Sequence, residues 1–199
     1  MFLFLRIERL GAHLATLKEL MDNYQRGDPR FIIDSLAWLT TAEKVMSELR
    51  LLQGSEMSAL RSRILRVTDA LPGGEERTRS AVRRAQNAAA TEALERAEVV
   101  MRQIVVEAEE RLERFEEKLT EGVTTAAMAG AIPPRTPVWM DWLRQVWHGL
   151  VQCAETRSLT VYLAASLPTP DRLFILDRVL SRLADVGSAG SVSSPSSAS

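Results

Sequence analysis

The chain is poor in the residues that build disulfides and metal centres, with one cysteine and two histidines among 199 residues. The single cysteine, Cys153, excludes an intramolecular disulfide. Structural zinc is held mostly by cysteine and histidine, and Cys153, His13 and His148 supply such a site poorly. No metal and no other cofactor is therefore expected.

The sequence also lacks a long apolar run and a strong excess of charge of one sign. No stretch approaches the roughly 20 apolar residues that span a bilayer. The apolar start, residues 1–5, lacks the basic leader and the cleavage site of a signal peptide. We therefore expect a cytoplasmic protein without a transmembrane segment. The net charge of −1 gives no long-range field that attracts nucleic acid, so a dedicated DNA-binding protein is not favoured.

Strand-forming residues are neither dense nor alternating, whereas Ala, Leu, Arg and Glu, which lose little side-chain freedom in a helix, are abundant. The predicted fold class is all-α. We expect a bundle of about six helices with one long, charged central helix and a C-terminal helical subregion. Helix should exceed about 65% of residues, well above the usual third.

Apolar residues in steps of three and four predict helices over about 3–25, 29–52 and 56–70. The segment 75–121 contains no glycine or proline and predicts a helix about 70 Å long if it is straight. A bend at 87–91, where helix formers are weakest, is the alternative. Together, residues 1–121 form the predicted bundle.

Three further segments follow the long helix. Residues 122–137 contain three prolines and no charge before Arg135, which predicts a Pro/Ala-rich linker. Residues 138–186 predict C-terminal helices packed on or beside the bundle. Residues 187–199 are rich in Ser and Ala, and their composition predicts a disordered tail.

The long helix carries an apolar seam in its second half, which includes Met101, Ile104, Leu112 and Phe115. Helices one to three are too short to cover a straight helix of this length, so part of the seam is expected to face a partner or a second copy, as in a coiled coil. Trp147 lies off the face that holds Trp139 and Trp142, and is a further candidate for partner contact. These features favour a non-enzymatic helical interaction or scaffold protein, most simply a homodimer.

Arginine and histidine pairs suggest an enzymatic alternative. Arg6 and His13 have six residues between them, a spacing that resembles the Arg–His motif of the HEPN helical-bundle ribonucleases, which implies catalytic roles for both residues. Arg144 and His148 lie on a later helix, with only three residues between them. The resemblance covers two residues and does not assign the chain to that family.

Two weaker hypotheses remain. Arg77, Arg79, Arg83 and Arg84 form the most basic segment and could neutralise phosphates, but no aromatic residue lies among them to stack on bases. Nucleic acid is therefore a less favoured partner than protein. A membrane-surface protein that acts through the linker and its neighbouring tryptophans is the third hypothesis.

Overall fold

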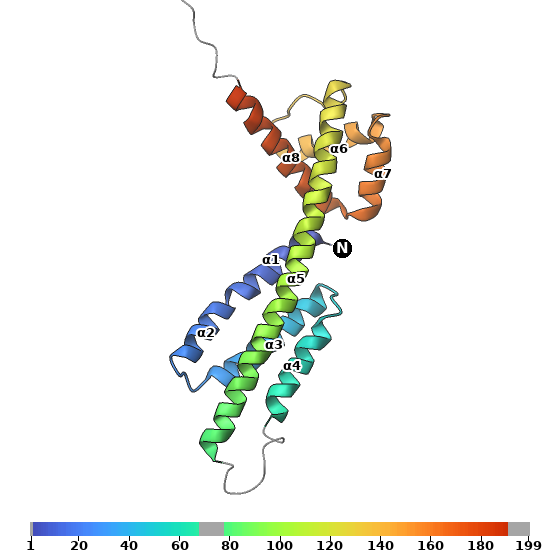
Figure 1. The fold of residues 1–199 in the computed structure, drawn as a ribbon. Helices are drawn as coiled ribbons and strands as arrows, with labels where there is room; N and C mark the ends of the chain where they lie inside the picture. Colours follow the sequence, from blue (N-terminus) through green and yellow to red (C-terminus); the bar gives the residue numbers. More distant parts are fainter. Residues whose placement is uncertain (1, 68–77, 191–199) are drawn as a thin grey trace, which may run out of the picture. The chain divides into compact units, whose positions relative to one another are not determined.

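The computed structural model describes residues 2–67 and 78–190, with side chains described as far as residue 184. Helices account for 83% of the residues in these ranges, which confirms the predicted all-α class and the long central helix. Figure 1 labels the helices in chain order. They are α1 (Leu3–Ala15), α2 (Leu17–Gln25), α3 (Phe31–Glu48), α4 (Gly54–Arg66), α5 (Arg79–Met128), α6 (Trp139–Gln152), α7 (Arg157–Ser166) and α8 (Thr169–Gly190).

The chain divides into two compact units. The described residues of unit 2 are 5–67 and 78–108, and those of unit 1 are 2–4 and 109–190. The sequence predicts instead that the whole long helix belongs to the N-terminal bundle. The division falls inside α5 because its first part packs with α1–α4. The second part contacts α7 and α8, through Phe115 and Glu116.

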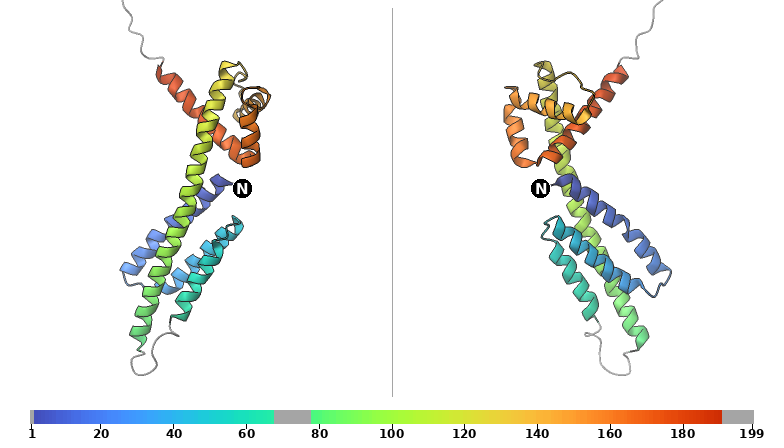
Figure 2. Two further views of the ribbon diagram at one scale, coloured as in Figure 1. Left: turned by 45° about the vertical axis from the view of Figure 1, so that its right-hand side comes forward. Right: turned by 180° about the vertical axis from the view of Figure 1, so that it is seen from behind.

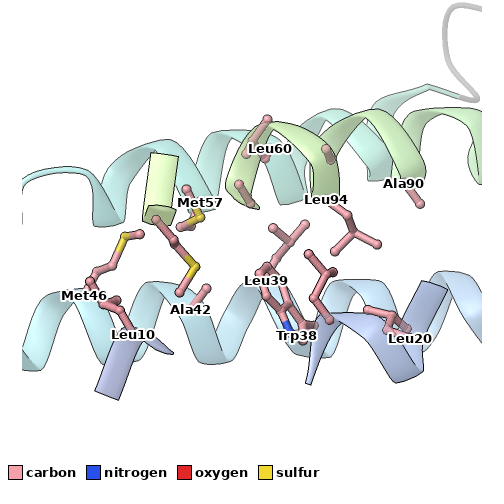
Figure 3. Packing of buried hydrophobic residues seen from close by; sticks show 14 of the residues in the cluster. Leu10, Leu20, Trp38, Leu39, Ala42, Met46, Met57, Leu60, Ala90 and Leu94 are labelled. Atoms are coloured by element: carbon pink, nitrogen blue, oxygen red, sulfur yellow. The ribbon is translucent and has the colours of Figure 1, made fainter. Parts of the chain in front are cut away.

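Unit 2 is a helical bundle around one hydrophobic core. In Figure 3, Leu39 and Met46 of α3, Met57 of α4 and Leu94 of α5 point into the same interior. All four side chains are completely buried. Burial of each such side chain contributes about 1.5–3 kcal/mol, so this shared core, to which α1 and α2 also contribute Leu10, Leu17 and Leu20, stabilises the unit.

The first predicted helix is divided in two at Thr16. The Thr16 hydroxyl donates a hydrogen bond to the His13 carbonyl oxygen (2.7 Å) and accepts one from Trp38 Nε1 (3.0 Å). A threonine side chain that bonds to nearby backbone competes with the helical hydrogen-bond ladder. The junction between α1 and α2 is thereby attached to α3, a contact that the apolar spacing does not reveal.

The long helix is continuous through the segment where the sequence allows a bend. Thr91 donates its hydroxyl to the Asn87 carbonyl oxygen (3.0 Å), a bond within the helix. The helix also continues seven residues beyond the expected end at Glu121, so the first part of the expected linker is helical. Helix formation continues there because Gly122, Val123 and Ala126 are buried.

The end of α5 is set by Gly130. This residue has a φ of +68°, which glycine adopts without steric cost. The amide of Ala131 then donates to the carbonyl of Ala126 (2.8 Å), and Gly130 donates to Ala127 (3.0 Å), the Schellman pattern of a helix C-terminus.

Unit 1 contains α6, α7 and α8 with the second part of α5, as the two views of Figure 2 show. Its N-terminal residues are attached to α8, because the Leu3 amide donates a hydrogen bond to Asp171 Oδ2 (2.7 Å). Helix α8 extends to Gly190, so residues 187–190 of the expected tail are helical. Residues 191–199 lie outside the described ranges.

Candidate interaction surfaces

The apolar seam of α5 is part of the interior and does not form a partner surface. Met101, Ile104, Leu112 and Phe115 are only 0%, 6%, 3% and 4% exposed. The expectation that one chain leaves them uncovered is wrong, because each part of α5 packs with helices of its own unit. The predicted homodimer through this seam thereby loses its basis.

The first Arg–His pair lies on α1. Arg6 is buried on α1, and His13 lies about 10 Å further along that helix. The His13 ring stacks on the Trp38 ring, with 4.4 Å between centroids, and its Nε2 donates to the Trp38 carbonyl oxygen (3.2 Å). Burial lowers the pKa of His13, an effect that this hydrogen bond partly offsets. The ring thus joins α1 to α3 through a stacking contact and a hydrogen bond.

The second Arg–His pair lies on α6 in unit 1. Arg144 is paired with Asp141 (2.8 Å), and both side chains are exposed. His148 is exposed on the same helix. No observation in the described residues joins His148 to a catalytic arrangement. Trp147 is half-buried, and the Arg172 guanidinium covers its ring at 5.0 Å from the centroid.

Unit 1 contains an apolar groove between α6 and α8, which we call the α6–α8 groove. Its volume is about 430 Å³. It is lined by Trp139, Met140, Leu143, Thr169, Pro170, Leu173, Phe174 and Asp177. Met140 is 45% exposed, and Trp139, Leu173 and Phe174 are half-buried. Large apolar side chains thus remain in contact with water along both walls.

One carboxylate lies on the edge of the α6–α8 groove. Asp177 Oδ1 accepts a hydrogen bond from Trp139 Nε1 (2.6 Å). Its other oxygen has no hydrogen-bond or ion-pair partner in the part of the chain that the structure describes. The Arg135 guanidinium covers the other side of this edge, 4.6 Å from the centroid of the Trp139 ring.

The α8 wall of the groove is fixed by contacts along the whole helix. Near its start, Asp171 accepts the Leu3 amide, and burial raises the pKa of this carboxyl group. The Phe4 ring packs on Phe174, with 4.0 Å between centroids. Further along, Arg178 and Arg182 pair with Glu116 of α5. The groove is therefore largely preformed.

The α6 wall depends on a glycine. A Cβ atom at Gly149 would lie 2.3 Å from the Ala131 carbonyl oxygen, a distance that real Cβ atoms essentially never show. Only glycine allows α6 to approach this backbone so closely. Trp142 Nε1 donates to the carbonyl oxygen of Pro133 (3.0 Å) in the same region, which attaches the segment after α5 to α6.

Unit 2 has a second groove, which we call the α3–α5 groove, with a volume of about 550 Å³. It is lined by Pro29, Ile32, Ile33, Arg79, Val82, Arg83 and Gln86. Of the predicted basic segment, the structure therefore places Arg79 and Arg83 at an apolar groove. Arg84 is exposed beside them, and Arg77 lies outside the described residues.

The described ranges contain no cluster of three or more His, Cys, Asp or Glu residues arranged to hold a metal ion. None of the described helices is long and apolar enough to cross a membrane. Comparison with protein-family models, curated proteins and solved structures finds no match.

The sequence does not reveal the α6–α8 groove. Met140, Leu173, Phe174 and Asp177 follow no recognisable motif, and three of them are residues that a bundle core also uses. The feature of the sequence that points to the groove is the width of the apolar face on both helices, which is greater than one helix–helix contact requires.

Proposed function

We propose that this chain is a non-enzymatic helical interaction protein whose α6–α8 groove binds an amphipathic helix of a partner protein. The observation that carries the proposal is a preformed apolar groove, lined by Trp139 and Phe174, with the carboxylate of Asp177 in its lining. Aromatic side chains in a pocket contribute most of the binding energy in many protein interfaces.

A helix fits this groove for geometric reasons. The space between two packed helices accepts side chains from one face of a third, at positions i, i+3, i+4 and i+7. Met140 and Leu173 lie on opposite walls, so a leucine or phenylalanine inserted between them contacts both. A lysine or arginine at the end of that apolar face would pair with Asp177, which defines the partner as an amphipathic helix with one basic residue.

The proposal keeps the interaction function that the sequence favours and moves it to another surface. A second copy of this chain is the competing occupant. Light scattering on a size-exclusion column separates the two, since a groove filled by a second copy gives twice the 22.2 kDa of one chain. We expect the mass of one chain for the purified protein.

The test places a photo-crosslinking amino acid at Met140 in cells. The matched control position is Val161 on α7, which is 64% exposed, belongs to the same unit and lies outside the groove. A protein that is crosslinked from position 140 and not from position 161 is then purified, and its Kd is measured.

Variants decide whether the groove itself binds. Met140→Glu should weaken the Kd at least tenfold, because it places an unpaired carboxylate in the apolar contact. Val161→Glu should change the Kd less than twofold. Asp177→Asn should weaken the binding of a partner that carries the basic residue. Replacement of that residue in the partner should remove the effect of Asp177→Asn on the Kd. Equal crosslinking from both positions, or a Kd unaffected by Met140→Glu, would refute the proposal.

A further inference from the structure

The α3–α5 groove combines an exposed apolar floor with positive charge. Ile33 is 64% exposed, and Ile32 and Val82 are half-buried beside it. Arg79 and Arg83 lie one helical turn apart on α5 and line the same groove. Like charges at this spacing destabilise a helix, so the chain keeps an unfavourable arrangement at an apolar surface.

Within the described residues these arginines have no carboxylate partner, unlike many other arginines in the unit. Arg79, Arg83 and Arg84 form no ion pair with any residue that the structure describes. Elsewhere in unit 2, six arginines are paired with a carboxylate. These pairs are Arg9–Glu48, Arg30–Asp34, Arg61–Glu43, Arg63–Glu92, Arg96–Glu56 and Arg102–Glu98.

Two described acidic residues near the groove, Asp28 and Asp34, have other partners. Asp34 pairs with Arg30, and Asp28 accepts the backbone amide of Arg30 (2.8 Å). Neither carboxylate lines the groove. The first turn of α5 contains no acidic residue and does contain Arg79, at the end of a helix where the peptide dipoles are already positive.

We infer that the α3–α5 groove is a second docking site, which binds an acidic segment of a protein partner that inserts aliphatic side chains against Ile33 and places carboxylates on Arg79 and Arg83. The site does not depend on the α6–α8 groove, because its residues belong to the other unit and it selects the opposite charge. The chain then has two interaction surfaces of different specificity, as a scaffold requires.

A protein segment fits this groove better than a nucleic acid. The lining consists of aliphatic side chains, two guanidinium groups and one amide, and it offers no aromatic ring on which a base could stack. Guanidinium groups bind carboxylates through two parallel hydrogen bonds, and Ile32, Ile33 and Val82 provide apolar contact area that a phosphate backbone would not use.

The experiment selects random peptides displayed on phage against the full-length protein, after depletion on the variant Arg79→Glu/Arg83→Glu. The expected peptides combine two or more carboxylates with Leu, Ile or Val. Binding of a synthetic peptide from this set should weaken about tenfold with Arg83→Glu, since a hydrogen bond between charged groups is lost and repulsion replaces it. Ile33→Ser should also weaken it severalfold.

Matched controls separate docking in the groove from general attraction to positive charge. Arg84→Glu changes the same charge on the adjacent residue, outside the groove lining, and should alter the Kd less than threefold. Leu65→Ser changes an apolar residue of α4 that is 57% exposed, and should have no effect. Met140→Glu should also have none, so a failure of this site is distinguishable from a failure of the α6–α8 groove.

Three results would overturn the inference. The first is that no peptide survives depletion, and the second is that the selected peptides lack carboxylates. The third is that Arg83→Glu and Arg84→Glu weaken binding equally while an oligothymidylate competes with the peptide. This last outcome would assign the arginines to nucleic-acid binding instead. Circular dichroism of each variant verifies that the fold is intact.

Discussion

The buried carboxylate of Glu116 provides the sharpest test of how unit 1 is held together. Its side chain is 5% exposed, whereas those of its partners Arg178 and Arg182 are 39% and 64% exposed. Arg182 donates a hydrogen bond to Oε2 (2.7 Å). Arg178 Nε lies 2.9 Å from Oε1, but Oε1 accepts no hydrogen bond from a described residue. Without the carboxylate, both arginines can still be solvated by water. Without the arginines, the buried carboxylate has no charged partner.

This asymmetry predicts an order of effects. Replacement of both arginines by methionine leaves a buried, unpaired carboxylate. Loss of a fully buried partner costs about 3–5 kcal/mol, and the exposure of both arginines reduces the expected cost to about 2–3 kcal/mol. Glu116→Gln leaves two guanidinium groups that can reach water, and should cost about 1 kcal/mol. The triple replacement of Glu116, Arg178 and Arg182 by methionine should lie within about 1 kcal/mol of the unchanged protein.

Urea unfolding followed by tryptophan fluorescence measures these differences, because three of the four tryptophans belong to unit 1. A loss of 2–3 kcal/mol lowers the midpoint by about 1–2 M urea. Arg114→Met, an exposed arginine on the same helix, is the control and should cost less than about 0.5 kcal/mol. If Glu116→Gln lowers the free energy of unfolding as much as the double arginine replacement does, an unpaired buried carboxylate is not the larger cost, and this reasoning is wrong. Arg182→Met should also cost more than Arg178→Met, since only Arg182 makes a hydrogen bond.

Three further outcomes are expected. Gly149→Ala should destabilise unit 1 by about 1–3 kcal/mol in urea unfolding, because the added Cβ meets a backbone oxygen. In the control Gly11→Ala, the added Cβ has nothing within 4 Å, and this change should stabilise α1 by about 0.5–1 kcal/mol. Arg50→Gly should raise the thermal midpoint by a few degrees, since this arginine has a φ of +54° that glycine adopts without strain, and an unchanged or lower midpoint would contradict this. Because the pKa of His13 is lowered in the folded protein, the unfolded chain binds more protons, so the contribution of His13 to stability is present above pH 6.5 and is lost as the pH falls below it. The urea midpoints at pH 7.5 and 5.5 should therefore differ less in His13→Gln than in the unchanged protein. An equal difference would show that another group titrates.

The fold class follows from local properties of the chain. Apolar residues at steps of three and four, strong helix formers and well-placed breaks are sufficient to predict the helices, and the absence of glycine and proline from 75–121 predicts the long one. The sequence predicts too early an end for α5, because Gly122 has weak local helix propensity and its burial depends on Leu159 and Thr156, which are distant in sequence. The division at Thr16 is not visible in the sequence pattern for the same reason, since the Thr16 side chain is bonded to Trp38, which lies in another helix.

The surfaces depend on tertiary structure. The apolar seam of α5 and the walls of the α6–α8 groove have similar sequence patterns, yet Phe115 is buried and Met140 is exposed. Periodicity shows that a helix has an apolar face, but not which other helix covers it. Likewise, the sequence shows a cluster of arginines, while only the approach of α3 to α5 places Arg79 and Arg83 beside Ile33. The presence of a helix is determined mainly by contacts within a few residues, whereas some helix boundaries and the grooves are determined by which distant segments share a core.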